Sequence, residues 1–268
     1  MALANQLRQE LGEALFDALC AGTTLAPLTT NHPDIDIEDA YHISRAMLAC
    51  RIAQNSEQVV GKKIGVTSAV VQKMLGVFQP DFGFLTNTMA FANGADIPVA
   101  GRLIQPRAEG EIAFVLKKDL RGTAISEDDV LAATDYITPC FEIVDSRIDN
   151  WQIKIQDTIA DNASCGVYVL GDARIDPKGL NLAALEINVF KNGLPLSRGL
   201  GESVQGNPLT AVAWLANTLG AFDIPLLAGE VILSGSVVPL EPVVAGDKMS
   251  LTLTGEGLTA SSVSCQFV

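Results

Sequence analysis

The chain has little positive charge and only two histidines. Lysine and arginine number 18 against 31 aspartates and glutamates, so the formal net charge is −13. Nucleic acids and anionic membrane surfaces are bound through basic patches, so this balance argues against both as partners. His32 precedes Pro33 in a polar stretch and His42 lies within a helical pattern, neither of them in a motif. Any serine–histidine, cysteine–histidine or histidine-rich zinc mechanism would need one of these two, and we interpret both as structural or surface residues.

The sequence also lacks a disulfide framework and a long apolar run. Its five cysteines are widely spaced and form no C-x-x-C pair, so we interpret them as free, buried thiols. No run of 18 apolar residues could span a membrane. The first residues do not resemble a secretory signal, and we therefore expect a cytoplasmic location.

What is present favours a folded α+β protein. The 268 residues are 48% hydrophobic and 18% charged, which excludes a disordered chain and permits a sizeable core. Helical spacing of apolar residues predicts helices over residues 3–19 and 37–55, the second capped by Asp36. Beyond residue 59 the pattern changes to short apolar runs bounded by glycine, proline, asparagine and aspartate, which is typical of strands. We predict a helical N-terminal section over residues 1–60 and a β-rich catalytic domain over residues 61–268.

The β-rich part is expected to contain both strands and a few helices. The predicted strands cover residues 112–116, 136–139, 166–170, 185–190, 231–233 and 249–253. The predicted helices cover residues 69–75, 127–134 and 209–219, the middle one capped by Ser126.

Two glutamates open the apolar run at residues 109–116. Side chains alternate along a strand, so Glu109 and Glu111 point to the same face as Ala113 and Val115. Adjacent carboxylates repel unless something neutralises them, as a divalent cation does. A solvated strand start is the alternative that spacing alone leaves open.

A third acid, Glu142, lies in the middle of another apolar run, residues 139–145. Buried acids are rare unless they are paired or bound to metal. Three carboxylates without a histidine suit Mg²⁺ or Mn²⁺ rather than zinc. The three glutamates are therefore our candidate metal ligands.

Two further stretches could supply proton-transfer groups. Glycines flank the lysine pair in residues 61–65, which allows the backbone to bend and present an amine, although the spacing is not that of a phosphate loop. A surface lysine pair is the alternative. Asp81 follows Pro80 among apolar residues and is either a turn residue or an acid held in a pocket. The polar stretch at residues 157–166 could line a site or form a cluster of turns.

These stretches resemble the 2-hydroxypenta-2,4-dienoate (2-keto-4-pentenoate) hydratase family, within the fumarylacetoacetase-like superfamily. The resemblance lies in residues 60–68, 75–83, 105–116, 142–151 and 157–166. It implies a mixed β-roll or sandwich core with a small helical N-terminal section. It also implies a cyclic homo-oligomer, with association with a downstream pathway enzyme left open.

The resemblance implies roles for individual residues. Glu109, Glu111 and Glu142 correspond to the ligands of the family's divalent metal, and Lys63 and Asp81 to its proposed acid–base residues. Ser164 and the loop around Asn162 resemble a wall of the substrate site. With the metal and Lys63, Arg107 would supply positive charge to a small anionic 2-oxo or 2-hydroxy acid.

The implied reaction is metal-dependent addition of water to a 2-hydroxy-2,4-dienoate, giving a 4-hydroxy-2-oxo acid in meta-cleavage catabolism of aromatic rings. A 4-oxalocrotonate decarboxylase resembles the same stretches and is the main alternative. An acylpyruvase-type C–C hydrolase is a weaker one, because that branch commonly uses a histidine–glutamate pair. A non-enzymatic protein whose glutamates hold a structural cation is also open.

Overall fold

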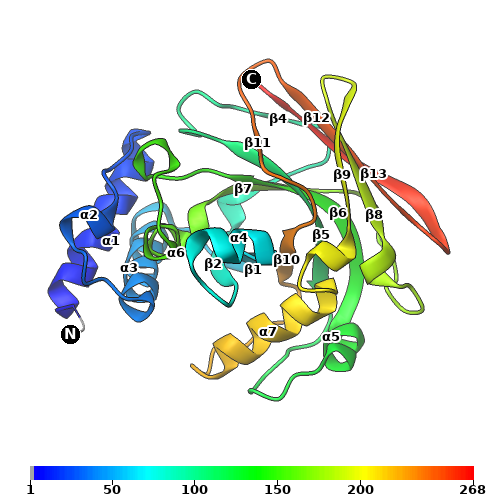
Figure 1. Ribbon diagram of the computed structural model, residues 1–268, viewed down its shortest axis with the longest axis horizontal. Helices are drawn as coiled ribbons and strands as arrows, with labels where there is room; N and C mark the ends of the chain where they lie inside the picture. Colours follow the sequence, from blue (N-terminus) through cyan, green and yellow to red (C-terminus); the bar gives the residue numbers. More distant parts are fainter. Residues whose placement is uncertain (1–2) are drawn as a thin grey trace.

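A computed structural model describes residues 3–268 of the chain, apart from the side chain of Val70. The helices are α1 (Asn5–Ala21), α2 (Leu28–Asn31), α3 (Ile37–Asn55), α4 (Ala69–Leu75), α5 (Glu127–Ala133), α6 (Ile155–Ala160) and α7 (Pro208–Gly220). The short 3-10 turns are η1 (Asn87–Met89), η2 (Asp149–Trp151), η3 (Asn162–Ser164), η4 (Leu182–Ala184) and η5 (Gly201–Ser203). The N-terminal helices α1–α3 lie together at one end of the molecule, next to a large curled sheet (Figure 1). A second sheet and the helices α5 and α7 lie on the far side from these helices.

The strands form two sheets within the described residues. The strands are β1 (Val59–Gly65), β2 (Asp81–Thr86), β3 (Ala90–Phe91), β4 (Ala95–Ile97), β5 (Arg107–Leu116), β6 (Thr134–Val144), β7 (Cys165–Leu170), β8 (Glu186–Lys191), β9 (Leu194–Leu200), β10 (Val231–Ser236), β11 (Glu241–Pro242), β12 (Lys248–Gly255) and β13 (Leu258–Phe267). The larger sheet has the order β2-β1-β10-β5-β6-β7-β3, with β11 added to β5, and the smaller has the order β4-β13-β12-β8-β9. The larger sheet is mixed, because β1 pairs with β10 and β3 with β7 in parallel while its other pairs are antiparallel. The predicted α+β class is confirmed.

The predicted elements follow from local signals that the structure retains. Helix α3 begins with a capping box, in which the Asp36 side chain accepts from Asp39 N and the Asp39 side chain accepts from Asp36 N. Ser126 caps α5 in the same way. Each predicted helix and strand corresponds to an observed one, with ends that differ by a few residues.

The main core lies between the two sheets and α7. Alternation along β5 sends Ile112 and Phe114 into this core, where they meet apolar side chains such as Leu251 of β12 and Val212 of α7. The opposite face of β5 is thereby free to carry polar side chains. That face also has a small apolar cluster, which we call the floor cluster: Leu85, Met89, Ala113, Cys140, Cys165, Tyr168 and Leu233.

The N-terminal helices have a core of their own. It joins residues of α1 and α3, such as Leu15 and Ile43, to Ile148 and to Ile155 and Ile159 of α6. The helical section thus packs against a segment from the middle of the chain. The division into domains at residue 60 stays a prediction, and residues 1–2 of that section lie outside the described residues.

Among the described residues, no helix is both long and apolar enough to cross a membrane.

Candidate active site

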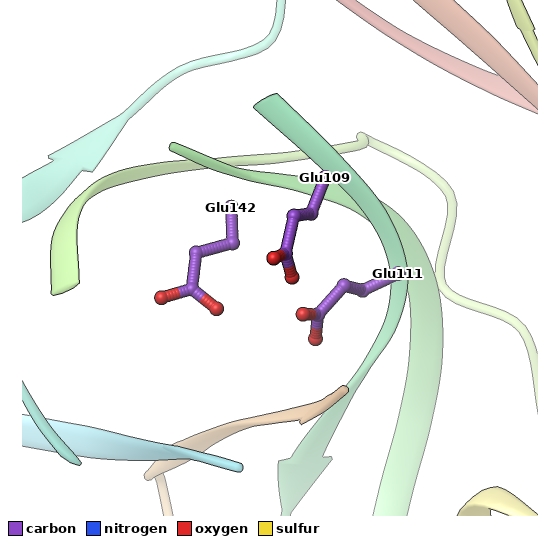
Figure 2. Close-up of side chains that lie close together, drawn as sticks. All are labelled: Glu109, Glu111 and Glu142. Carbon is purple, nitrogen blue, oxygen red and sulfur yellow. The ribbon is translucent and has the colours of Figure 1, made fainter. Parts of the chain in front are cut away.

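The three glutamates meet on one face of the larger sheet. Strands β5 and β6 pair antiparallel with Glu109 directly opposite Glu142, and Glu111 opposite Cys140. The period-two alternation of strands therefore brings all three carboxylates to the same side. One carboxylate oxygen from each lies within 4.8 Å of the others, and Figure 2 shows the three groups pointing toward a common centre.

These carboxylates are poorly satisfied by the described residues. Glu111 and Glu142 are fully buried and Glu109 is half-buried. Glu111 Oε2 accepts a hydrogen bond from Gly235 N at 2.8 Å. Glu111 Oε1 and both Glu142 oxygens accept none from the described part of the chain. Buried carboxylate oxygens without hydrogen bonds are costly, so this arrangement requires compensation from positive charge.

The repulsion among the three carboxylates contributes to raised pKa values of Glu109 and Glu111. Burial, and then the nearby Glu142 carboxylate, raises the pKa of Glu109 to about 7. Burial and the same neighbours raise the pKa of Glu111 well above its usual range. An all-oxygen set of this kind, with unfilled acceptors converging on one point, fits a hard divalent cation.

Lys63 and Asp81 reach the same centre from neighbouring strands. Lys63 Nζ lies 3.1 Å from Glu142 Oε1. In the antiparallel β1–β2 pair, Asp81 lies opposite Gly65, two residues beyond Lys63 and on the same face. Asp81 is buried, and its Oδ1 accepts no hydrogen bond from the described residues. The alternative that Asp81 is a turn residue is wrong.

The two groups differ in their protonation. Burial raises the pKa of Asp81 to about 6, against the opposing effect of the Lys63 charge. Burial favours the neutral amine of Lys63, but the carboxylates of Glu142 and Asp81 outweigh it and raise the pKa of Lys63 above its usual value. The site therefore favours a charged amine at Lys63 beside an acid, Asp81, whose pKa burial raises.

Lys62 points to the other face of β1. Its Nζ lies 2.5 Å from both Glu230 oxygens, and both side chains are buried. Since Lys63 is buried as well, the alternative of a surface lysine pair is wrong for both residues.

Arg107 lies on β5, two residues before Glu109. It is half-buried, and its guanidinium lies 4.6 Å from the ring centre of Trp151. The indole Nε1 of Trp151 donates to Gln105 O at 3.0 Å, which holds the ring in place. Within the described residues the guanidinium forms no ion pair with a carboxylate. Its charge is therefore free to meet an anion near the glutamates.

The acids of the polar stretch at residues 157–166 are fully engaged elsewhere. Asp157 accepts from Thr29 N at 3.0 Å and from Thr29 Oγ1 at 2.8 Å, which joins α6 to α2. Asp161 forms a buried ion pair with Arg147 at 2.5 Å and also accepts from Arg147 N at 2.8 Å. These acids hold the structure around the site rather than reaching into it.

Asn162 and Ser164 lie on the turn that follows α6. The Asn162 amide accepts from Phe84 N at 2.8 Å and donates to Phe84 O at 2.9 Å, so both of its ends are occupied by β2. Ser164 Oγ lies 3.1 Å from Thr158 Oγ1. Residues 162–164 all have φ between 50° and 53°, the left-handed region. This turn packs against β2, and a substrate-binding role for either side chain stays a prediction.

Sequence reasoning gave no role to Gly235. It lies at an irregularity in the β5–β10 register, and its amide is the donor to Glu111. A glycine inside an apolar strand is the available signal, since it marks a bulge or a close backbone approach. The two histidines lie in the helical section, at the end of α2 and on α3, apart from the three glutamates.

Comparison with known proteins agrees with this geometry. The family described as "Fumarylacetoacetate (FAA) hydrolase C-terminal" matches residues 50–264. The chain belongs to this family. It is 60% identical over 254 residues to the 2-hydroxyhexa-2,4-dienoate hydratase of Comamonas testosteroni, covering 94% of the chain and 96% of that relative. It is 56% identical over 218 residues to the 2-hydroxypent-2,4-dienoate hydratase of Pseudomonas putida, covering 81% of the chain and 98% of that relative.

A solved structure shares the whole fold. The 4-oxalocrotonate decarboxylase from Pseudomonas putida G7, complexed with magnesium and adipate, superposes with a TM-score of 0.94 at 31% identity, covering 100% of this chain and 99% of the other. The predicted hydratase family and hydro-lyase class are confirmed by the two relatives, which match more closely in sequence than the decarboxylase does.

Proposed function

We propose that this protein is a metal-dependent hydratase that adds water to a short 2-hydroxy-2,4-dienoate and forms a 4-hydroxy-2-oxo acid in aromatic meta-cleavage catabolism. The observation that carries the proposal is the set of three converging carboxylates, with orphaned buried oxygens, beside Lys63 and Asp81. The names of the two hydratase relatives support the substrate class and a length of five or six carbons.

Glu109, Glu111 and Glu142 would hold a divalent cation, which we propose to be Mg²⁺, with Mn²⁺ suited to the same donors. The magnesium in the related decarboxylase structure supports this choice. When bound, the cation supplies a Lewis acid for the carboxylate and C2 oxygen of a 2-oxo acid.

Lys63 and Asp81 divide the remaining work according to their acidities. Ketonisation removes the proton of the C2 hydroxyl and adds one at C5; water then attacks C4 and a proton is added at C3. Asp81, with a pKa of about 6, can accept and return protons near neutral pH. Lys63 remains charged and stabilises negative charge on the substrate oxygen, because its raised pKa makes it a poor base.

The surroundings would orient the substrate. Arg107 offers an unpaired guanidinium to the substrate anion, and the Ser164 hydroxyl lies on the adjacent turn. Asn162 would act by fixing that turn to β2. Ala113 and Cys140 of the floor cluster follow Glu111 and precede Glu142 by two residues on the same face, and would border the hydrocarbon tail.

The decarboxylase remains the second candidate, because its structure matches this chain over its full length. Two substrates distinguish the hydratase from the decarboxylase: freshly made 2-hydroxypenta-2,4-dienoate, and its six-carbon relative with a second carboxylate attached to C5. Identification of the products by mass is expected to show gain of water from the first. Loss of CO₂ from the second, without hydration of the first, would establish the decarboxylase instead. The cyclic homo-oligomer, the downstream enzyme partner and the cytoplasmic location stay predictions.

A further inference from the structure

Gly65 occupies an unusual position next to Asp81. It lies directly opposite Asp81 in the β1–β2 pair and on the same face of β1 as Lys63. Directly opposite residues of an antiparallel pair normally bring their Cβ atoms into contact. Here the Asp81 carboxylate lies in the space that the missing side chain leaves, because a Cβ atom at residue 65 would overlap with Asp81 Oδ1.

The backbone at Gly65 does not itself require glycine. Gly65 is not among the residues with a left-handed φ, and it is an ordinary strand residue. The Cβ position also lies 3.4 Å from Lys63 Nζ. The absent methyl group is therefore what allows the Asp81 carboxylate to lie beside the Lys63 amine.

We propose that Gly65 is a positioning residue, whose lack of a side chain sets the place of the Asp81 carboxylate relative to Lys63. The inference rests on the proposed function, in which Asp81 transfers protons, but its structural part can be tested separately. Because nothing but the Asp81 side chain fills the Cβ position so closely, the effect of adding a methyl group must depend on Asp81.

The test is a double-mutant cycle of Gly65→Ala and Asp81→Ala. Gly65→Ala alone should lower kcat for 2-hydroxypenta-2,4-dienoate by roughly 10²-fold, the loss typical of a displacement of about 1 Å, while changing KM much less. In the Asp81→Ala background it should lower kcat no further. Equal losses of kcat in both backgrounds would overturn the proposal.

Thermal stability gives a readout that does not depend on the reaction. Gly65→Ala should lower Tm when Asp81 is present and leave it unchanged or raise it in Asp81→Ala, where the new methyl group fills the vacated space. The same decrease in both backgrounds would overturn the proposal. If the wild-type protein fails to hydrate the substrate, the proposed function falls, yet the Tm cycle still decides whether Gly65 makes room for Asp81.

Gly61 provides the matched control on the same strand and face. A Cβ atom there would overlap with the carbonyl oxygen of Val231 on β10, far from Asp81 along β1. Gly61→Ala should therefore lower Tm by the same amount with or without Asp81. Coupling of Gly61 to Asp81 as strong as that of Gly65 would show that β1 responds as a whole, and would reject a specific role for Gly65.

Discussion

Two groups of buried acids in this protein are built in opposite ways. On β5 and β6, Glu111 and Glu142 are completely buried, and three of their four oxygens accept no hydrogen bond from the described residues. Around α6, Asp157 and Asp161 are equally buried, but both oxygens of each accept hydrogen bonds. Burial alone does not distinguish the two groups; the difference lies in what satisfies the carboxylates.

The contrast indicates that one group of acids stabilises the fold and that the other group serves the function. The Arg147–Asp161 pair is complete without any other molecule, and losing one partner would leave the other charge exposed to a low dielectric. The glutamates on β5 and β6 are incomplete as they stand, and a cation is the simplest way to complete them. Changes in the first group should therefore lower stability, and changes in the second should abolish function.

The largest effect is expected at the glutamates. Glu109→Gln or Glu142→Gln should reduce Mg²⁺ affinity severely and abolish turnover, because a neutral amide is a weak ligand for a hard cation. Tm without metal should stay the same or rise for Glu109→Gln, since repulsion is relieved, and should fall for Glu142→Gln, which also removes the buried ion pair with Lys63. Calorimetric titration and a melt measure both quantities, and chelation of the wild-type protein should mimic the loss of turnover.

Glu127→Gln is the control for this prediction, because Glu127 is exposed in the first turn of α5. It should bind metal as the wild type does. Equal Mg²⁺ affinity in all three variants would show that Glu109 and Glu142 are not metal ligands.

A smaller loss is expected at Lys63. Lys63→Ala should lower kcat by roughly 10²–10³, the usual range for losing a group that stabilises developing negative charge. Lys62→Met is the contrasting variant: it breaks the buried pair with Glu230 and should lower stability by about 3–5 kcal/mol while the folded fraction keeps its kcat. Steady-state kinetics at saturating Mg²⁺, with a denaturant melt, would reject the assignment if Lys62→Met lost more kcat than Lys63→Ala.

The smallest effect is expected among the satisfied acids. Asp157→Ala leaves the buried amide and hydroxyl of Thr29 without their acceptor, which should lower the free energy of unfolding by about 1–3 kcal/mol. Mg²⁺ affinity of the folded protein should not change. If Asp157→Ala lost metal binding without losing stability, the proposed difference between the two groups of acids would be wrong.

Elements with a strong local signal could be predicted from the sequence. Helix α3 has a cap and an apolar stripe, and β5 and β6 are long apolar runs. The sequence pattern does not predict β1, because two adjacent lysines interrupt the apolar run and their burial depends on partners elsewhere in the chain. The pattern does not predict strand β13 either, because serine and threonine fill its outer face.

The same limit applies to the site. The trio of glutamates could be proposed because strand alternation and a resemblance pointed to the same residues. The hydrogen bonds between Asn162 and Phe84 could not be predicted, because those residues are 78 positions apart and only the folded sheet brings them together. The burial of Lys62 against Glu230 depends on a contact between residues that are even farther apart in the sequence.

The parallel pairing of β1 with β10 has a consequence for the order in which the protein is made. Lys62 and Glu230 are separated by 168 residues, and the Gly235 amide that holds Glu111 lies beyond them. During synthesis β1 must therefore wait roughly 10–30 s for its neighbour to leave the ribosome. Through that interval an edge of β1, with its two lysines, has no strand to pair with, and the charges on those lysines help to keep it from joining other nascent chains. The candidate active site, which needs β10 and the Gly235 amide, is consequently among the last parts of the molecule to be completed.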